Sequence, residues 1–249
     1  MKTILITGCS SGFGLEIARY FLARDWHVVA TMRNPRNDLF APSDRLRILP
    51  LDVTDQESIR SAVEMAGPID ALVNNAGFGA ASPAELTPMS TVREVFETNT
   101  FGTIAMTQAV LPQFRQRKAG VVVNVTSSVT LKPLPLVSVY RASKAAVNAF
   151  TESLAEELAP FGVRAHLVLP GRSPETAFRD NAGGHMHGLD HEAYAAFVQK
   201  VFARMLDTTS PVTYSQDVAE AVWHAVTDPS APMRIPAGAD AKAWAAENA

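Results

Sequence analysis

The chain has 249 residues, of which 47% are hydrophobic and 19% are charged. This composition excludes an intrinsically disordered chain and permits a sizeable core in one α/β domain. Lys and Arg number 22 and Asp and Glu number 25, so the formal net charge is −3, and no basic bias favours nucleic acid or an anionic membrane. The single Cys9 excludes an internal disulfide and a cysteine-rich zinc site and suits a reducing compartment.

The N-terminal residues 1–7 begin with a cation and an apolar run, as a secretory signal does. The run is far shorter than the hydrophobic region of a signal and meets Gly8 at once. We therefore interpret it as a buried first strand and expect a cytoplasmic protein, since no apolar run reaches the length of a membrane span. Similar short apolar runs recur at residues 4–6, 28–30, 48–49, 71–73, 121–123 and 166–169.

Apolar runs that do not alternate with polar residues indicate strands buried on both faces, as in a parallel sheet. Segments with helical spacing lie between them, for example at residues 13–22 and 59–66. The alternation predicts a single-domain, doubly wound (Rossmann-type) α/β fold over residues 1–249, with about seven parallel strands and helices on both faces. Residues 172–211 carry no strand signal, and we expect a substrate lid there. A short edge strand at 233–236 and an Ala-rich tail complete the chain.

A glycine-rich turn follows the first predicted strand, where residues 7–14 read T-G-C-S-S-G-F-G. Glycines let the backbone approach a phosphate closely, and the N-terminus of the following helix offers free N–H groups to it. The alternative is a merely convenient turn between strand and helix. We expect the turn to bind a cofactor through Gly8, Ser10, Ser11, Gly12, Phe13 and Gly14.

This T-G-x-x-x-G-x-G spacing resembles the short-chain dehydrogenase/reductase family, and the resemblance continues in order along the chain. Residues 74–77 read N-N-A-G, residues 99–102 read N-T-F-G, residues 140–144 read Y-R-A-S-K, and residues 170–171 read P-G. Ser127 stands thirteen residues before Tyr140, which is the usual spacing in the family. The resemblance covers the chain to about Thr176. It implies a nicotinamide cofactor with further contacts from Asn75, Ala76, Gly77, Pro170 and Gly171.

The chemistry of the motif follows from its residue types. Tyr140 and Lys144 are four residues apart and share one face of a helix. A free tyrosine has a pKa of about 10, and a nearby ammonium lowers it, so we expect Tyr140 to act as general acid or base. Ser127 can donate a hydrogen bond to the substrate carbonyl oxygen. The resemblance implies that Lys144 also binds the nicotinamide ribose and that Asn99 holds a water in a proton relay.

Each of these residues also has an ordinary structural interpretation. The Tyr–Lys pair could lie on the surface, Ser127 could be a strand-end hydroxyl, and Asn99 could bond only to backbone. Ser128 stands beside Ser127, but the thirteen-residue spacing favours Ser127.

The end of the second predicted strand decides the choice of cofactor. An acidic residue there binds the ribose hydroxyl of NAD, whereas a basic one accommodates the 2′-phosphate of NADP. Met32 stands where NAD-preferring relatives carry an acid and Arg33 follows it, which predicts NADP(H), with a solvated surface charge as the alternative. Asp52 and Val53 resemble the pair that contacts adenine, although Asp52 could also cap the helix that begins near Asp55.

The predicted lid holds apolar residues at helical spacing, which either pack on the domain or line a substrate pocket: Tyr194, Phe197, Val198, Val201, Phe202, Met205 and Leu206. We expect no metal at His185, His187 and His191, because their spacing matches no zinc motif and no cysteine is nearby. Thr176 stands one residue beyond the position at which many members of the family place a threonine near the nicotinamide carboxamide.

These features predict an NADPH-dependent carbonyl reductase or alcohol dehydrogenase. The resemblance of residues 7–14 and 30–33 to hydroxysteroid and retinol dehydrogenases favours apolar ketones. The alternatives are a 3-oxoacyl thioester reductase and a non-catalytic NADPH sensor. A sugar-nucleotide epimerase would have another glycine spacing and a longer C-terminal domain, and an enoyl reductase would separate its Tyr and Lys more widely. We expect a small carbonyl or alcohol substrate and no nucleic acid, and the resemblance implies a homo-oligomer, either a dimer or a tetramer.

Overall fold

The structure, a computed structural model, describes residues 1–176, 183–205 and 210–247. Its centre is one parallel sheet of seven strands in the order β3-β2-β1-β4-β5-β6-β7. The strands are β1 (Thr3–Ile6), β2 (His27–Met32), β3 (Leu46–Pro50), β4 (Ala71–Asn74), β5 (Gly120–Val125), β6 (Val163–Pro170) and β7 (Arg234–Ala237). The predicted Rossmann-type sheet is confirmed, including the edge strand near residues 233–236.

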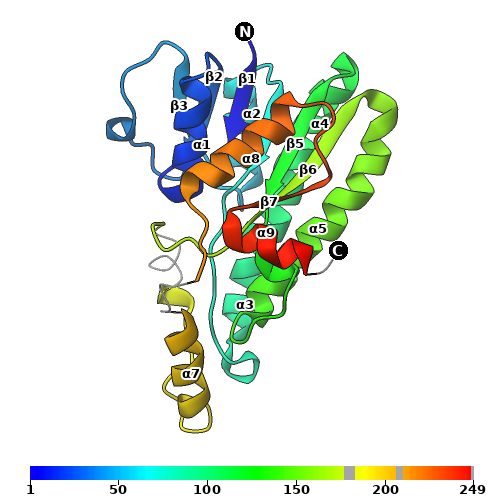
Figure 1. Cartoon of the computed structure of the whole chain (residues 1–249). Helices are drawn as coiled ribbons and strands as arrows, with labels where there is room; N and C mark the ends of the chain where they lie inside the picture. The colour runs from blue at the N-terminus through cyan, green and yellow to red at the C-terminus, as the bar shows by residue number, and fades with distance from the viewer. Residues whose placement is uncertain (177–182, 206–209, 248–249) are drawn as a thin grey trace.

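Helices cover both faces of this sheet (Figure 1). The clusters of buried side chains place α1 and α8 on one face and α2, α4 and α5 on the other. The helices are α1 (Gly12–Leu22), α2 (Gln56–Ala66), α3 (Met89–Phe96), α4 (Gly102–Arg117), α5 (Ser138–Leu158), α7 (Ala195–Met205), α8 (Ser215–Thr227) and α9 (Ala239–Ala246). Among the described residues, no helix is both long enough and apolar enough to cross a bilayer.

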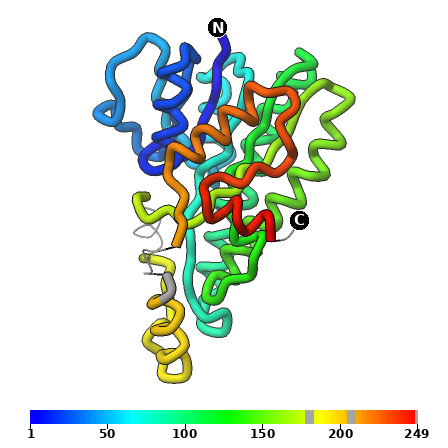
Figure 2. The backbone as a smooth tube through the Cα atoms, viewed as in Figure 1, coloured from blue at the N-terminus to red at the C-terminus, as the bar shows by residue number. Residues whose placement is uncertain are grey.

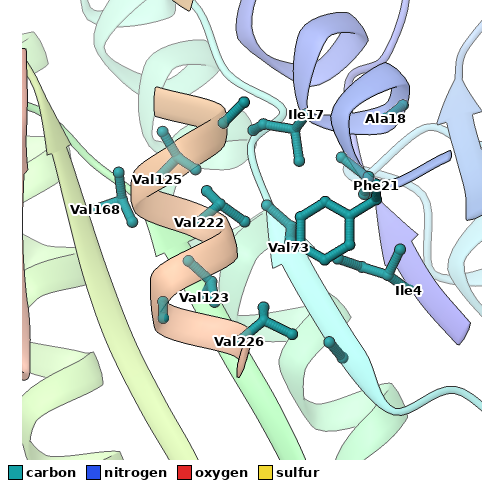
Figure 3. Packing of buried hydrophobic residues seen from close by; sticks show 14 of the residues in the cluster. Ile4, Ile17, Ala18, Phe21, Val73, Val123, Val125, Val168, Val222 and Val226 are labelled. Carbon is teal, nitrogen blue, oxygen red and sulfur yellow. The ribbon is translucent and has the colours of Figure 1, made fainter. Parts of the chain in front are cut away.

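The cluster under α1 and α8 explains why the strands read as continuous apolar runs. Phe21 of α1 and Val222 and Val226 of α8 face strand side chains such as Val73 (Figure 3). A second cluster fills the opposite face of the sheet. Side chains on both faces of a strand are therefore removed from water, and each large aliphatic one contributes about 1.5–3 kcal/mol.

The site is positioned by the reversal of strand order at the centre of the sheet. Strand β1 lies between β2 and β4, so the chain leaves the centre in both directions. A crevice forms outside the carboxyl ends of the strands at such a point. Expected site residues follow each of the strands β1 to β5, and the fold therefore brings these residues to one edge of the sheet.

The predicted lid contains helix α7, which projects from the body beyond the carboxyl ends of the strands (Figure 2). Val198 and Val201 are buried against Leu136, and the Tyr194 hydroxyl donates to Glu85 Oε2 at 2.7 Å. Part of the predicted apolar face thus packs on the domain, whereas Phe197 is exposed. Leu206 of the predicted face lies outside the described residues.

The Ala-rich tail is a helix, α9, which the sequence analysis did not predict. Alanine is the best helix former, and Gly238 precedes the helix with a φ of +92°. The first turn is anchored because Asp240 and Ala241 are buried. Helix α9 is therefore part of the folded body.

Candidate active site

A cavity of about 950 Å³ runs along the carboxyl edge of the sheet. Arg33, which follows β2, and Asp52, which follows β3, both line the cavity. Tyr140 and Lys144 line it from α5. Its lining includes these predicted residues: Gly8, Ser10, Ser11, Gly12, Phe13, Arg33, Asp52, Val53, Asn75, Ala76, Gly77, Tyr140 and Lys144. Its volume and elongated set of lining residues fit a dinucleotide.

The glycine-rich turn requires its glycines for two different reasons. Gly8 has a φ of +74°, and a Cβ there would lie 2.8 Å from the Ala76 Cα atom. A Cβ on Gly14 would collide with the carbonyl oxygen of Gly8 and lie 2.5 Å from Asn75 Nδ2. Ser11, the N-cap of α1, makes no side-chain cap bond, and the first turn of the helix contains no acidic residue. The helix N-terminus can therefore receive a phosphate.

Thr7 joins the turns that follow β1 and β4. Its hydroxyl oxygen accepts hydrogen bonds from the backbone N–H groups of Asn75 and Ala76, both at 2.9 Å. Asn75 Nδ2 returns to the carbonyl oxygens of Thr7 and Gly8 at 3.0 and 3.1 Å. The N-N-A-G segment is thereby fixed against the glycine-rich turn, so the two form one wall of the cavity.

Arg33 and Asp52 stand together among the residues after β2 and β3. The Asp52 carboxylate accepts from the backbone N–H and the hydroxyl of Thr54 at 2.9 and 2.7 Å. These bonds, aided by the charge of Arg33, hold the pKa of Asp52 below its usual value. Asp55, not Asp52, caps α2, since its side chain accepts from the backbone N–H groups of the first turn. Arg33 is exposed, with its side chain at the cavity.

The side chains of Tyr140, Ser127 and Lys144 lie together, where β5 ends and α5 begins. Tyr140 and Lys144 lie one turn apart on α5, and both are buried. A hydrogen bond joins the side chains of Tyr140 and Ser127, and Ser127 Oγ also accepts from the backbone N–H of Val129 at 3.3 Å. Lys144 Nζ donates to the carbonyl oxygen of Val125 at 3.1 Å. The surface-pair interpretation of Tyr140 and Lys144 is therefore wrong.

Asn99 lies in a π-helical turn, Glu97–Phe101, between α3 and α4. Its side chain is fully buried and pairs with the backbone of Phe78 in both directions, at 3.0 and 2.9 Å. Asn99 Nδ2 also donates to Ser143 Oγ at 3.2 Å. A Cβ on Gly77 would lie 2.7 Å from Asn99 Oδ1 and 3.4 Å from Lys144 Nζ. The three predicted residues are therefore neighbours.

Comparison with known proteins identifies this combination of fold and site. The family model for short chain dehydrogenases matches residues 2–186. The chain belongs to the short-chain dehydrogenase family. It is 37% identical over 238 residues to the uncharacterized oxidoreductase YusZ of Bacillus subtilis, an alignment that covers 91% of this chain and 85% of that protein.

Two further relatives support the assignment to the short-chain dehydrogenases. Human retinol dehydrogenase 8 is 40% identical over 182 residues, covering 68% of this chain and 58% of that protein. The crystal structure of a short-chain dehydrogenase from Streptomyces avermitilis superposes with a TM-score of 0.84 at 33% identity, covering 99% of this chain and 91% of that one. The protein is thus an oxidoreductase of a family that acts on CH–OH or C=O groups with a nicotinamide cofactor.

Burial governs the proton affinities of Tyr140 and Lys144 in this short-chain dehydrogenase. It raises the pKa of Tyr140 to about 12, although the hydrogen bond with Ser127 acts in the opposite direction. It lowers the pKa of Lys144 to about 8. The sequence predicts a lowered pKa for Tyr140, whereas the structure has it raised, because removing the phenolate from water costs more than the hydrogen bond with Ser127 recovers. At neutral pH Tyr140 holds its proton.

Five predicted site residues are not among the cavity's described lining residues: Gly14, Asn99, Ser127, Pro170 and Gly171. Pro170 ends β6 and Gly171 follows it, and the Gly171 backbone N–H donates to Thr213 Oγ1 at 2.9 Å. Thr176 does line the cavity, and its Cβ atom lies 3.4 Å from where a Cβ on Gly12 would stand. It therefore lies against the glycine-rich turn.

The three lid histidines make separate contacts. His185 stacks on Phe78 with ring centroids 4.3 Å apart, His187 Nε2 lies 3.0 Å from Thr91 Oγ1, and His191 Nδ1 accepts from the backbone N–H of Ala193 at 3.2 Å. Within the part of the chain that the structure describes, no three His, Cys, Asp or Glu side chains form a group suited to a metal.

The sequence analysis missed two supports of the site. One is Thr7, whose place directly before Gly8 was the available signal. The other is a buried ladder in which Asn74 Nδ2 donates to Asn124 Oδ1 at 2.8 Å and Asn124 Nδ2 donates to Thr151 Oγ1 at 2.8 Å. Asn124 interrupts the apolar run of β5, and a polar residue inside a buried strand is the signal that could have revealed this ladder.

Proposed function

We propose that this short-chain dehydrogenase is an NADPH-dependent carbonyl reductase or alcohol dehydrogenase that acts on apolar ketones or secondary alcohols. The observation that carries the proposal is the buried, hydrogen-bonded pair of Tyr140 and Ser127 beside Lys144. A non-catalytic NADPH sensor would not need these three groups together.

The residues have separate roles in the proposed reaction. A nicotinamide bound in the cavity would be the source of the hydride that the carbonyl carbon receives. Ser127 donates a hydrogen bond to the carbonyl oxygen, where negative charge develops. Tyr140 delivers its proton to that oxygen, and its raised pKa makes it protonated over the physiological range. Lys144 holds positive charge near the tyrosine, and Asn99 fixes the backbone at Phe78 on the same side of the cavity.

The proposed preference for NADPH rests on Arg33. Its side chain lines the cavity near Asp52 and is exposed, so its guanidinium is accessible to a 2′-phosphate. Of the other two cations between β2 and β3, Arg36 is held by Asp38 at 2.6 Å and Arg45 pairs with Asp25. Met32 provides no carboxylate to hydrogen-bond the ribose hydroxyl of NAD.

The proposed preference for apolar substrates has support from the other lining residues. Phe78 and His185 form a stacked aromatic wall next to Gly77. Glu94 and Glu97 line the same cavity, and Arg93 lines it beside them. The two carboxylates outnumber this one guanidinium, so the charge of this part of the lining disfavours an anionic oxo-acid. Retinol dehydrogenase 8, the relative described above, carries an apolar substrate in its name.

Other expectations from the sequence stay predictions: the cytoplasmic location, the single-domain organisation of residues 1–249, the contacts of Pro170 and Gly171 with a cofactor, and a dimer or tetramer. The Val147, Leu154 and Leu158 side chains of α5 are buried within the chain and Phe150 is half-buried, so these apolar side chains do not decide the oligomeric state, which must be measured.

The decisive experiment measures catalytic efficiency with NADPH and with NADH on four substrates: an aryl alkyl ketone, a steroid ketone, a 3-oxoacyl thioester and a short 2-oxo acid. We expect the two apolar ketones to be the better substrates and NADPH the better donor. A clear advantage for the thioester would favour the alternative acyl reductase. Binding of NADPH without turnover of any substrate would favour the sensor.

A further inference from the structure

A buried carboxylate outside the catalytic group ties the C-terminal helix to the start of the lid. Asp240, in the first turn of α9, is 6% exposed. Its Oδ2 atom accepts from the backbone N–H of Arg172 at 2.6 Å. Its Oδ1 atom lies 2.7 Å from Thr213 Oγ1 and accepts from the backbone N–H of Ala241 at 2.9 Å. Each carboxylate oxygen is thus occupied.

Thr213 extends this arrangement to the end of β6. It is fully buried, and its hydroxyl oxygen accepts from the backbone N–H of Gly171 at 2.9 Å. Its own backbone N–H donates to the carbonyl oxygen of Arg172 at 2.8 Å. Asp240 and Thr213 therefore hold both backbone amides with which the chain leaves the sheet.

Two glycines make room for the contact. A Cβ on Gly171 would collide with both carboxylate oxygens of Asp240, and a Cβ on Gly238 would collide with Thr213 Oγ1. The close approach means that the carboxylate packs directly on the backbone of the P-G motif. A side chain that only filled space would require neither its charge nor these hydrogen bonds.

The backbone held in this way leads to the cavity. Residues 171–176, which we call the return segment, run from the end of β6 to Thr176 against Gly12. Glu175 Oε1 accepts from the backbone N–H of Ser215 at 2.5 Å and anchors the segment a second time. The return segment is therefore fixed by Thr213 and by the first residues of α8 and α9, while its far end lies against the glycine-rich turn.

We propose that Asp240 is a positioning residue of the cofactor site: with Thr213 it fixes the return segment over Gly12, so that the segment is already in place when the diphosphate of the cofactor binds. The inference rests on the proposed function, because it takes the ligand of that turn to be a dinucleotide. A backbone that is fixed before binding loses less conformational entropy when the ligand binds. This raises the affinity only for ligands that contact the fixed segment.

Isosteric variants test the hydrogen bonds rather than the packing. Asp240→Asn places an NH₂ donor against one of the N–H or O–H donors, and Thr213→Val removes the hydroxyl at nearly constant volume. Thr213→Ser keeps the hydroxyl and serves as the conservative rescue. Asp217→Asn is the matched control, because Asp217 accepts from the Tyr214 backbone N–H at the start of α8 and makes no bond to the return segment.

The first readout needs no ligand. Hydrogen exchange of the peptide that contains residues 171–176 should quicken about tenfold or more in Asp240→Asn and Thr213→Val, and should match wild type in Thr213→Ser and Asp217→Asn. Unchanged exchange in both isosteric variants would overturn the anchoring role.

The second readout compares two ligands by fluorescence titration. NADPH spans the cavity, whereas adenosine 2′-monophosphate lacks the diphosphate. We expect the Kd for NADPH to rise about tenfold in Asp240→Asn and Thr213→Val, with the Kd for the fragment within about twofold of wild type. An equal loss for both ligands, or no loss of NADPH affinity, would overturn the proposal. Failure of the proposed function is distinct, because it is seen in the wild-type chain itself, either as no binding of NADPH or as binding of NADPH without turnover of a ketone.

Discussion

The phenolic hydroxyl of Tyr140 is the only proton donor in the proposed mechanism, so Tyr140→Phe tests the assignment most directly. The substitution keeps the ring and removes one oxygen. Lys144 Nζ stays bound to the carbonyl oxygen of Val125, and Ser127 Oγ keeps the N–H of Val129. We therefore expect the cavity to keep its shape and the Kd for NADPH to stay within about threefold of wild type.

The magnitudes for activity and stability are different. A positioned acid contributes about 10²–10⁴-fold to the rate, which is about 3–5 kcal/mol of transition-state free energy. The fold loses one neutral hydrogen bond, with Ser127, worth about 0.5–1.5 kcal/mol. For a chain of this length that corresponds to a decrease in Tm of about 1–6 °C. Activity should thus collapse in a protein that remains folded at assay temperature.

The assay is a single turnover of the best ketone by enzyme preloaded with NADPH, so that product release does not hide the chemical step. Tyr194→Phe is the control, because it removes a tyrosine hydroxyl of the lid that donates to Glu85. This substitution should leave the rate within about threefold of wild type. A Tyr140→Phe rate within tenfold of wild type would refute the assignment of the acid.

Three further outcomes follow from the site. Arg33→Asp should lower the ratio of catalytic efficiency with NADPH to that with NADH by about tenfold or more. Arg36→Ala should leave this ratio unchanged, because Asp38 already holds the Arg36 side chain. Equal ratios in the two variants would contradict the role of Arg33. Since burial lowers the pKa of Lys144 to about 8, ketone reduction should be fastest below that pH and fall as the ammonium loses its proton above it; a kcat/KM profile flat to pH 9.5 would contradict this role. Gly14→Ala should cost about 1–3 kcal/mol through the collision with the Gly8 carbonyl, visible as a lower urea midpoint, and an unaltered midpoint would show that the turn can shift at no cost.

The sequence predicts those parts of the site that local spacing determines. Tyr140 and Lys144 share a helical turn, and Gly8 follows the end of a buried strand, so both placements follow from the period of the element that carries them. The parallel sheet follows in the same way from its short apolar runs. These features need no knowledge of which distant residues meet.

What the sequence does not predict depends on contacts between distant segments. Asp240 and Arg172 are 68 residues apart and Thr7 and Asn75 are also 68 apart, so no periodicity relates them. The raised pKa of Tyr140 is missed for a related reason: the spacing of Tyr140 and Lys144 shows the favourable charge but not the depth at which both groups are buried.

The π-helical turn at Glu97–Phe101 has a consequence for how insertions and deletions act on this chain. A π-turn is an α-helix that holds one additional residue, and each residue of an α-helix corresponds to about 100° of rotation. Val95 before the turn and Met106 after it are both fully buried. Deleting one residue between them would make the helix regular, but it would rotate one of these side chains away from its contacts. The π-turn thus lets α3 and α4 both keep their apolar side chains buried while Asn99 stays beside the cavity wall. A one-residue deletion here should therefore lower the stability of the fold far more than a substitution would.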